Sequence, residues 1–173
     1  MGKADGSAQS GRIVIRIAKE GDLPDVARIY NDAILNTTAT FDTVPKMVDE
    51  WREIFASHNE LFPLVVAEVD SKIVGWGALR SFIKRPAARH TVEDAVYVDP
   101  AYRGKGIGSV ILEYLLNCAK SSGHHAVVAL VVAGNAASER LHEKMGFERI
   151  GILREVGNKF NKWLDLIIYE KIL

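Results

Sequence analysis

Three glycines at positions 104, 106 and 108 stand in the segment that could do chemistry, residues 103–109. A strand-like run ends just before this segment and a helical pattern starts at about residue 106. Glycine allows the backbone to approach a ligand closely, and the unpaired N–H groups and positive dipole end of a helix start attract phosphate. Arg103 and Lys105 add positive charge. The pattern fits a phosphate-binding loop, or a glycine-rich turn with solvated basic residues.

Two other glycine-rich phosphate motifs do not occur in the sequence. No GxxxxGK[ST] pattern is found, which excludes the P-loop of ATPases and GTPases. No GxGxxG pattern is found either, because the glycines at 75 and 77 are not followed by a glycine at 80. If residues 103–109 bind phosphate, they do so by a third route.

The elements around this loop are predicted from the period of their apolar residues. Alternation and apolar runs indicate strands at 12–18, 62–69, 73–82, 91–99, 126–132, 147–156 and 164–172. Helical spacing indicates helices at about 23–34, 46–58, 106–122 and 135–145. Turns are expected at 70–72 and 157–162. This order mixes hairpins with strand–helix–strand units and predicts an α/β protein with a mixed sheet.

Length and composition limit the organisation of the chain. A length of 173 residues suits one domain, placed at 12–173, and residues 1–11 are interpreted as a disordered tail or a cloning remnant. Equal counts of basic and acidic residues, 22 each, argue against a nucleic-acid partner. No run reaches the length of a membrane span. The single cysteine, Cys118, excludes an intrachain disulfide and favours a reducing, cytoplasmic location.

The sequence Arg103-Gly104-Lys105-Gly106-Ile107-Gly108 resembles the pyrophosphate loop of the GNAT superfamily of acyl-CoA N-acyltransferases. The downstream pattern Asn135-x-x-Ser138 fits the same family in order and spacing. The resemblance spans residues 12–173 and implies the GNAT fold, a mixed, mostly antiparallel sheet flanked by helices, with acetyl-CoA as cosubstrate and no metal. Relatives are often dimers, so a homodimer is expected. Further segments resemble the phosphinothricin acetyltransferase group, whose members acetylate phosphinothricin, methionine sulfoximine or methionine sulfone: 30–31, 40–41, 91–93, 141–143 and 163–165.

Acetyl transfer to an amine requires a group that removes a proton. An α-amine has a pKa of about 8 and is mostly protonated at neutral pH, so a general base is needed. The resemblance makes Glu93 this base, and the alternative is a solvated strand carboxylate. Asp94 is expected to be that solvated carboxylate, since alternation sends it to the opposite face of the strand.

The resemblance also assigns the groups that hold the cosubstrate and its leaving sulfur. Backbone N–H groups on the strand before the loop are implied to hold the thioester carbonyl and the pantetheine arm. His142 stands where many relatives carry a tyrosine, and is expected to supply a proton to the thiolate or to orient it; the alternative is a packed helix histidine. The full set implied for acetyl-CoA is Val96, Tyr97, Val98, Arg103, Gly104, Lys105, Gly106, Ile107, Gly108, Ser109, Asn135 and Ser138.

An amino-acid acceptor would need a cationic site beside the amine. Basic residues crowd the segment before Glu93, and arginine offers a planar fork for a carboxylate or phosphinate. Aromatic residues Phe41, Phe82 and Trp163 favour a closed pocket for a small anionic amine. The predicted acceptor residues are Asn31, Phe41, Arg80, Phe82, Arg89, Thr91 and Glu93, and a solvated charge cluster is the alternative.

Three functions therefore remain open at this point. The first is acetyl-CoA-dependent acetylation of the α-amine of a small amino acid. The second is acetylation of protein N-termini or lysines, which would need an open groove. The third is an acyl-CoA-binding module without catalysis. The pair Glu93 and His142 favours an enzyme over the third.

Overall fold

The computed structural model describes residues 12–173, and the tail or remnant expected at 1–11 lies outside the described residues. Its seven strands form one sheet in the order β1-β2-β3-β4-β5-β7-β6. All neighbouring pairs are antiparallel except β4 and β5, which confirms the predicted mixed, mostly antiparallel sheet. The bounds are β1 Val14–Ile17, β2 Leu64–Val69, β3 Lys72–Ser81, β4 Thr91–Val98, β5 Ala126–Val132, β6 Glu148–Lys159 and β7 Lys162–Ile172.

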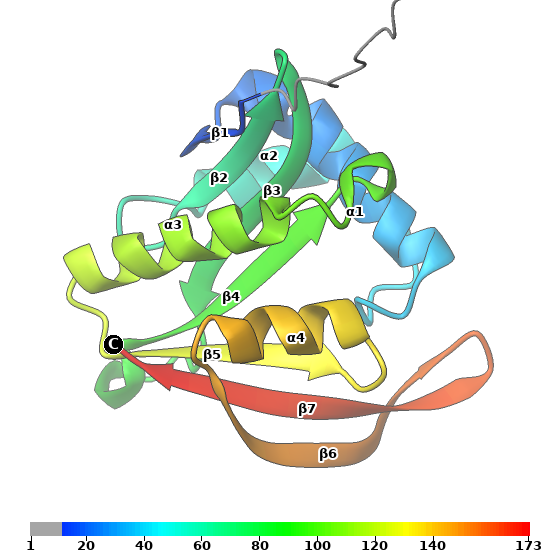
Figure 1. Cartoon of the computed structure of the whole chain (residues 1–173), viewed down its shortest axis with the longest axis vertical. Helices are drawn as coiled ribbons and strands as arrows, with labels where there is room; N and C mark the ends of the chain where they lie inside the picture. The colour runs from blue at the N-terminus through cyan, green and yellow to red at the C-terminus, as the bar shows by residue number, and fades with distance from the viewer. Residues whose placement is uncertain (1–11) are drawn as a thin grey trace, which may run out of the picture.

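Two helices cover each face of the sheet (Figure 1). Helices α1 (Leu23–Asn36) and α2 (Val48–Ala56) bury a cluster that includes Trp51 and Trp76. Helices α3 (Ile107–Ser121) and α4 (Ala136–Lys144) lie on the other face, where Ile111, Leu112 and Leu115 are fully buried. Helices α1 and α3 thus each bury an apolar stripe against the sheet, whereas the buried residue of α4 is His142. Among residues 12–173, no helix is long and apolar enough to cross a membrane.

Strands β4 and β5 stay together over only part of their length. Their register runs from Thr91 opposite Ala126 to Glu93 opposite Val128. The antiparallel register of β4 with β3, in contrast, continues to Val98 opposite Gly75. The two parallel strands diverge beyond Glu93 (Figure 1), which leaves the last five residues of β4 with an open edge.

Two tight hairpins shape the sheet. The β2–β3 turn is made by Asp70 and Ser71, with φ values of 49° and 62°, where the sequence predicts a turn. The β6–β7 turn is likewise only two residues long, Phe160 and Asn161, so the turn predicted at 157–162 was too long. A register shift between 153 and 157 takes up the extra residues, after which Gly157 pairs again with β7.

Candidate functional site

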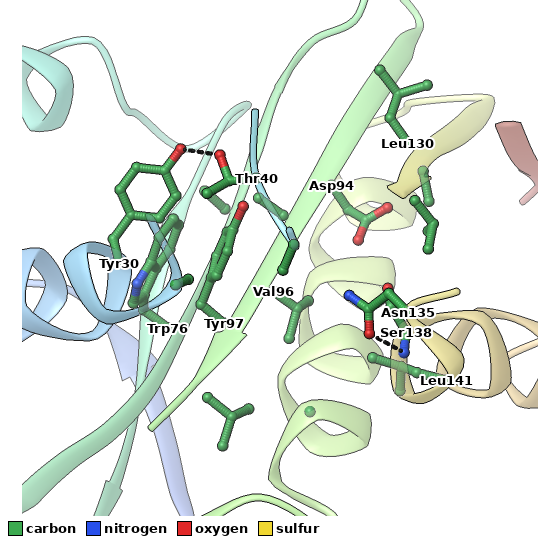
Figure 2. A pocket seen from close by; sticks show the side chains of 18 of the residues that line it. Tyr30, Thr40, Trp76, Asp94, Val96, Tyr97, Leu130, Asn135, Ser138 and Leu141 are labelled. Atoms are coloured by element: carbon green, nitrogen blue, oxygen red, sulfur yellow. Dashed lines mark hydrogen bonds between the residues drawn. The ribbon is translucent and has the colours of Figure 1, made fainter. Parts of the chain in front are cut away.

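A cleft of about 1830 Å³ occupies the gap where β4 and β5 diverge. Figure 2 shows side chains of β3, β4, β5 and α4 converging on it, with Tyr30 and Thr40 at one end. The cleft extends from the segment that joins α1 to α2, across β4, to the glycine loop. Of the residues predicted from the sequence, it brings together Phe41, Arg80, Phe82, Glu93, Val96, Tyr97, Val98, Arg103, Gly104, Gly106, Ile107, Gly108, Ser109, Asn135, Ser138 and His142.

The open edge of β4 directs two backbone N–H groups into the gap. The amide of Asp99 donates to Val74 on β3, and the amide of Phe82 donates to the carbonyl of Thr91, so odd-numbered residues of β4 face β3. Successive backbone groups of a strand point to opposite sides. The N–H groups of Val96 and Val98 therefore face β5, across the gap. These two groups are among the donors implied for the thioester carbonyl, and that role stays a prediction.

The glycine loop adopts backbone angles that only glycine takes without strain. Gly104 and Gly106 have φ values of 75° and 80°, and Gly106 is the N-cap of α3. A β-carbon built on either glycine would meet no atom within 4 Å. The loop therefore leaves open space over the first amides of α3, where a phosphate group can approach.

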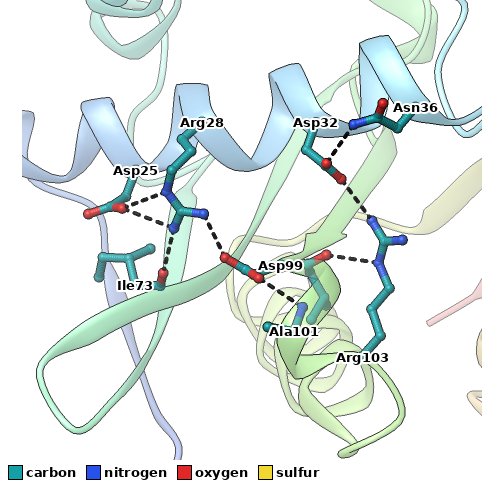
Figure 3. A network of polar contacts seen from close by, with 9 residues as sticks. Asp25, Arg28, Asp32, Asn36, Ile73, Asp99, Ala101 and Arg103 are labelled. Atoms are coloured by element: carbon teal, nitrogen blue, oxygen red, sulfur yellow. Dashed lines mark hydrogen bonds and ion pairs between the residues drawn. The ribbon is translucent and has the colours of Figure 1, made fainter.

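A network of charged residues fixes this loop to α1 (Figure 3). Arg28 donates to Asp99 at 2.6 Å, and Asp99 also accepts from the amide of Ala101 at 2.9 Å in the short helix η3 (Pro100–Tyr102). Burial alone would raise the pKa of Asp99, but these donors hold it below its usual value. Arg103 donates to the carbonyl of Val98 and lies 3.5 Å from Asp32. The side chain of Arg103 is thus held by contacts with β4 and α1.

Glu93 and Arg80 face each other across β3 and β4. They are register partners and form an ion pair between Nη2 of Arg80 and Oε1 of Glu93. The Glu93 side chain is 11% exposed, whereas that of Arg80 is 65% exposed. The side chain of Arg80 is therefore largely in solvent, whereas the carboxylate of Glu93 that it binds lies inside the cleft. The sequence predicted both residues but not that they would bind each other.

Asp94 was expected in solvent, and that expectation is wrong. It does lie on the opposite face from Glu93, but α4 covers that face and the residue is only 7% exposed. Its Oδ2 lies 3.1 Å from Nε2 of His142, whose Nδ1 lies 2.8 Å from the carbonyl oxygen of Ser138. Both ring nitrogens of His142 thus have partners inside the fold. The alternation of side chains along the strand predicted the face on which Asp94 lies, but it could not predict that α4 packs on that face.

Tyrosine and tryptophan rings line the end of the cleft nearest α1. The ring of Tyr97 stacks on Trp76 at 4.8 Å and meets Tyr30 edge-on at 4.9 Å. The hydroxyl of Tyr30 bonds Thr40 and donates to Asp42, both at 2.9 Å. Burial raises the pKa of Tyr97 to about 12 and that of Tyr30 further, so both phenols stay protonated at neutral pH. None of Trp76, Asp42 and Thr40 was predicted as a site residue.

The β6–β7 hairpin, at the edge of the sheet beyond β5, closes this end of the cleft. The buried ammonium of Lys159 donates to the carbonyl of Thr40 at 2.9 Å, and burial lowers its pKa. A β-carbon on Gly157 would lie 2.6 Å from the ring of Phe41, so the hairpin packs directly against that ring. Phe160, at the hairpin turn, also lines the cleft. Residues more than a hundred positions apart thus form one wall.

Several predicted residues lie outside the cleft lining. Asn31 instead bonds the backbone of Lys46 through both ends of its amide, which fixes the segment that follows α1. Arg89 is exposed at the end of the short helix η2 (Pro86–Ala88), and Thr91 starts β4. Lys105 lies over the ring of Tyr102. Trp163, expected in the pocket wall, is 66% exposed on β7.

Asn135 has a structural role in addition to its place in the cleft. Its side-chain oxygen accepts from the amide of Ser138 at 3.3 Å and caps α4. The capping oxygen is therefore engaged, and the amide nitrogen is the part of the side chain left for a ligand. Helix α4 is held in place at its start by this cap and along its buried face by His142.

Comparison with known proteins gives matches over nearly the whole chain. The acetyltransferase (GNAT) family matches residues 26–147. A methionine sulfoximine/methionine sulfone acetyltransferase of Pseudomonas paraeruginosa is 39% identical, over 90% of this chain and 92% of its own. The crystal structure of a phosphinothricin acetyltransferase from Sinorhizobium meliloti, in complex with acetyl-CoA, is 31% identical with a TM-score of 0.90, over 93% and 88% of the two chains. A ribosomal-protein-alanine N-acetyltransferase from Brucella melitensis is 40% identical with a TM-score of 0.87, over 92% and 99%.

Proposed function

The chain belongs to the acetyltransferase (GNAT) family, and from that premise we propose that it transfers the acetyl group of acetyl-CoA to the α-amine of a small amino acid. The acceptors we propose are methionine sulfoximine, methionine sulfone or phosphinothricin, on which the relatives act. The observation that carries the proposal is the position of Glu93. This buried carboxylate lines the same cleft as the open edge of β4 and the glycine loop.

The residues present fit acetyl-CoA. The open space above Gly104 and Gly106 and the first amides of α3, including that of Gly108, suit a pyrophosphate. The N–H groups of Val96 and Val98, on the edge of β4 beyond its pairing with β5, suit the polar groups of an extended arm laid along β4. When bound, acetyl-CoA supplies an acetyl group activated as a thioester.

Groups of the protein itself accept and supply the protons and stabilise the charge that develops during acetyl transfer. Glu93 accepts the proton that the α-amine must lose before its nitrogen can attack. The N–H groups of Val96 and Val98 donate to the oxygen on which negative charge develops. His142 holds the proton that the departing sulfur requires, since a thiol has a pKa of about 8.5. The three groups stand on β4 and α4, which the sheet and the Asn135 cap hold in place.

Recognition of an amino acid rests on Arg80 and on the closed end of the cleft. Arg80 is the cation nearest to Glu93, so a carboxylate bound to it would place the adjacent amine beside the base. The hairpin, through Lys159 and Phe160, walls the end beyond Phe41. This closure favours a short side chain over a polypeptide. Acetylation of a protein N-terminus, the activity that the Brucella relative's name states, is the second candidate.

An acetylation panel tests the proposal. Purified protein with acetyl-CoA is offered methionine sulfoximine, methionine sulfone, phosphinothricin, a polyamine and a peptide with an N-terminal alanine. We expect the highest kcat/KM for one of the three amino acids, and thermal stabilisation by acetyl-CoA alone. A clear preference for the peptide would replace the small-molecule assignment. Stabilisation by acetyl-CoA without acetylation of any amine would indicate a binding module.

We further propose a homodimer and a cytoplasmic location. Strand β6 lies at the edge of the sheet (Figure 1) and exposes Ile150, Ile152, Leu153 and Val156 by between 41% and 54%. An exposed apolar edge strand is a surface that a second copy can cover. Light scattering after gel filtration tests the dimer. The location rests on the single cysteine, Cys118.

A further inference from the structure

A buried carboxylate–imidazole pair joins β4 to α4 beside the cleft. Asp94 and His142 have side chains 2% and 5% exposed, and Oδ2 of Asp94 lies 3.1 Å from Nε2 of His142. Both residues line the cleft. Figure 2 shows the side chain of Asp94 leaving β4 on the side of the gap where Leu130 of β5 and Asn135 lie, where the strands have diverged.

The contacts of the ring fix how many protons the pair holds. Nδ1 of His142 lies 2.8 Å from the carbonyl oxygen of Ser138, which can only accept, so Nδ1 carries a hydrogen. A second hydrogen must lie between Nε2 and Oδ2 for their contact to be a hydrogen bond. The pair therefore holds two protons at rest. Either the imidazole is charged beside a carboxylate, or a neutral ring accepts from a protonated Asp94.

The surroundings favour the charged ring. Within residues 12–173, Oδ1 of Asp94 is buried without a hydrogen-bond partner, so His142 is the one polar side chain that compensates this carboxylate. Burial alone would lower the pKa of His142, but the hydrogen bond and charge of Asp94 and the Ser138 carbonyl more than offset it, and the pKa is raised.

The other groups that pack on the ring bring no cation. From β7, the ring of Tyr169 stacks at 6.1 Å, and its hydroxyl donates to Glu143 at 3.1 Å, while its pKa is raised mainly by burial. Phe147 meets the imidazole edge-on at 5.0 Å. On α4 itself, the hydroxyl of Ser138 lies 3.4 Å from Nδ1. None of these three groups in contact with the ring is cationic, so none of them opposes the protonated form of His142.

We propose that Asp94 is a positioning residue that keeps His142 protonated, with its Nε2–H held by Oδ2 of Asp94 at the edge of the gap between β4 and β5. The inference rests on the proposed acetyl transfer and adds a residue to it. The Nε2–H, hydrogen-bonded at rest to Oδ2 of Asp94, is then shared with the departing sulfur. The Nε2–H bond breaks as the new S–H bond forms, and the N–H electron pair stays on the ring, which becomes neutral. The bare nitrogen then faces the carboxylate of Asp94, an arrangement that favours taking up a new proton from solvent before the next turnover.

The variant Asp94→Asn removes the charge but keeps the shape. Its amide can donate to a neutral Nε2, so the ring stays in place while its neutral form is favoured. We expect the ¹⁵N resonances of His142, followed by NMR in the protein without ligands, to titrate at lower pH in this variant than in the wild type. We also expect the alkaline limb of the kcat/KM profile to move to lower pH, with a loss at pH 8.5 that is ~10-fold or more greater than the loss at pH 6.5.

Matched measurements separate this role from a structural one. Asp49→Asn removes the same charge from the exposed start of α2. It should shift neither the titration of His142 nor the alkaline limb of the kcat/KM profile. In a His142→Gln background, Asp94→Asn should cause no further shift of the limb. An unchanged limb in Asp94→Asn with a lowered melting temperature would overturn the proposal.

The wild type alone also tests it. If Asp94→Asn does not fold, a wild-type His142 that titrates at or below the pKa of an exposed histidine, about 6.5, overturns the proposal. A raised titration in a protein that acetylates none of the amines in the panel would contradict the proposed function but not the pairing of Asp94 with His142.

Discussion

Replacing Arg80 by glutamine should change the preference of the enzyme between amines with and without a carboxylate. In the structure, Arg80 forms an ion pair with Glu93, the proposed base. A substrate carboxylate that competes for Arg80 would release Glu93 at the moment the amine arrives. An amine without a carboxylate would leave the pair intact. The ion pair thus links recognition of the carboxylate to removal of the proton.

The magnitude follows from the exposure of the arginine. A hydrogen bond to a charged group contributes about 1.5–3 kcal/mol when protected from water. The Arg80 side chain is 65% exposed, so about 1–2 kcal/mol is the reasonable range after screening, equivalent to ~5–30-fold in kcat/KM. Arg80→Gln should lower kcat/KM for methionine sulfone by this factor. For the corresponding amine without the carboxylate, kcat/KM should stay constant or rise, because Glu93 no longer has a competing partner.

The assay follows release of the CoA thiol with both amines, for the wild type and for Arg80→Gln. Arg89→Gln is the matched control, since it removes the same charge from an exposed position outside the cleft lining and should change neither rate. An equal fall for both amines would mean that Arg80 only supports Glu93. No change for either amine would mean that Arg80 takes no part in recognition.

Three further substitutions test the base, the loop and the packing of the sheet. Glu93→Gln should lower kcat/KM by ~10²–10⁴-fold and most strongly near pH 7, where the amine is protonated, with unchanged CoA affinity by calorimetry; a rate kept across pH 6–9 would exclude Glu93 as the base. Gly106→Val should abolish most CoA binding, whereas Gly123→Val, with a similar φ of 75° and equal open space, should not. If the two variants bound CoA with equal affinity, the pyrophosphate would not lie over Gly106. Gly77→Ala puts a β-carbon 2.5 Å from Ile111 and should lower the free energy of unfolding in urea by about 1–3 kcal/mol, whereas Gly151→Ala meets open space and should not.

Much of the fold was predictable because its signals are local. Apolar periods gave the strands and helices in their correct order, and the glycines at 104 and 106 marked a strand-to-helix loop, where the structure has positive φ values. Alternation along β4 also placed Glu93 and Asp94 on opposite faces. These features depend on the backbone and on the side-chain period of two, which short stretches of sequence encode.

The composition of the cleft was decided by tertiary structure. Alternation tells which face a side chain takes but not what covers that face, so Asp94 was expected in solvent although α4 lies over it. The pairing of Arg80 with Glu93 depends on the register of β3 against β4. The wall between Thr40 and Lys159 joins residues 119 positions apart. Such contacts follow from how whole elements pack, and no local pattern of residue types specifies them.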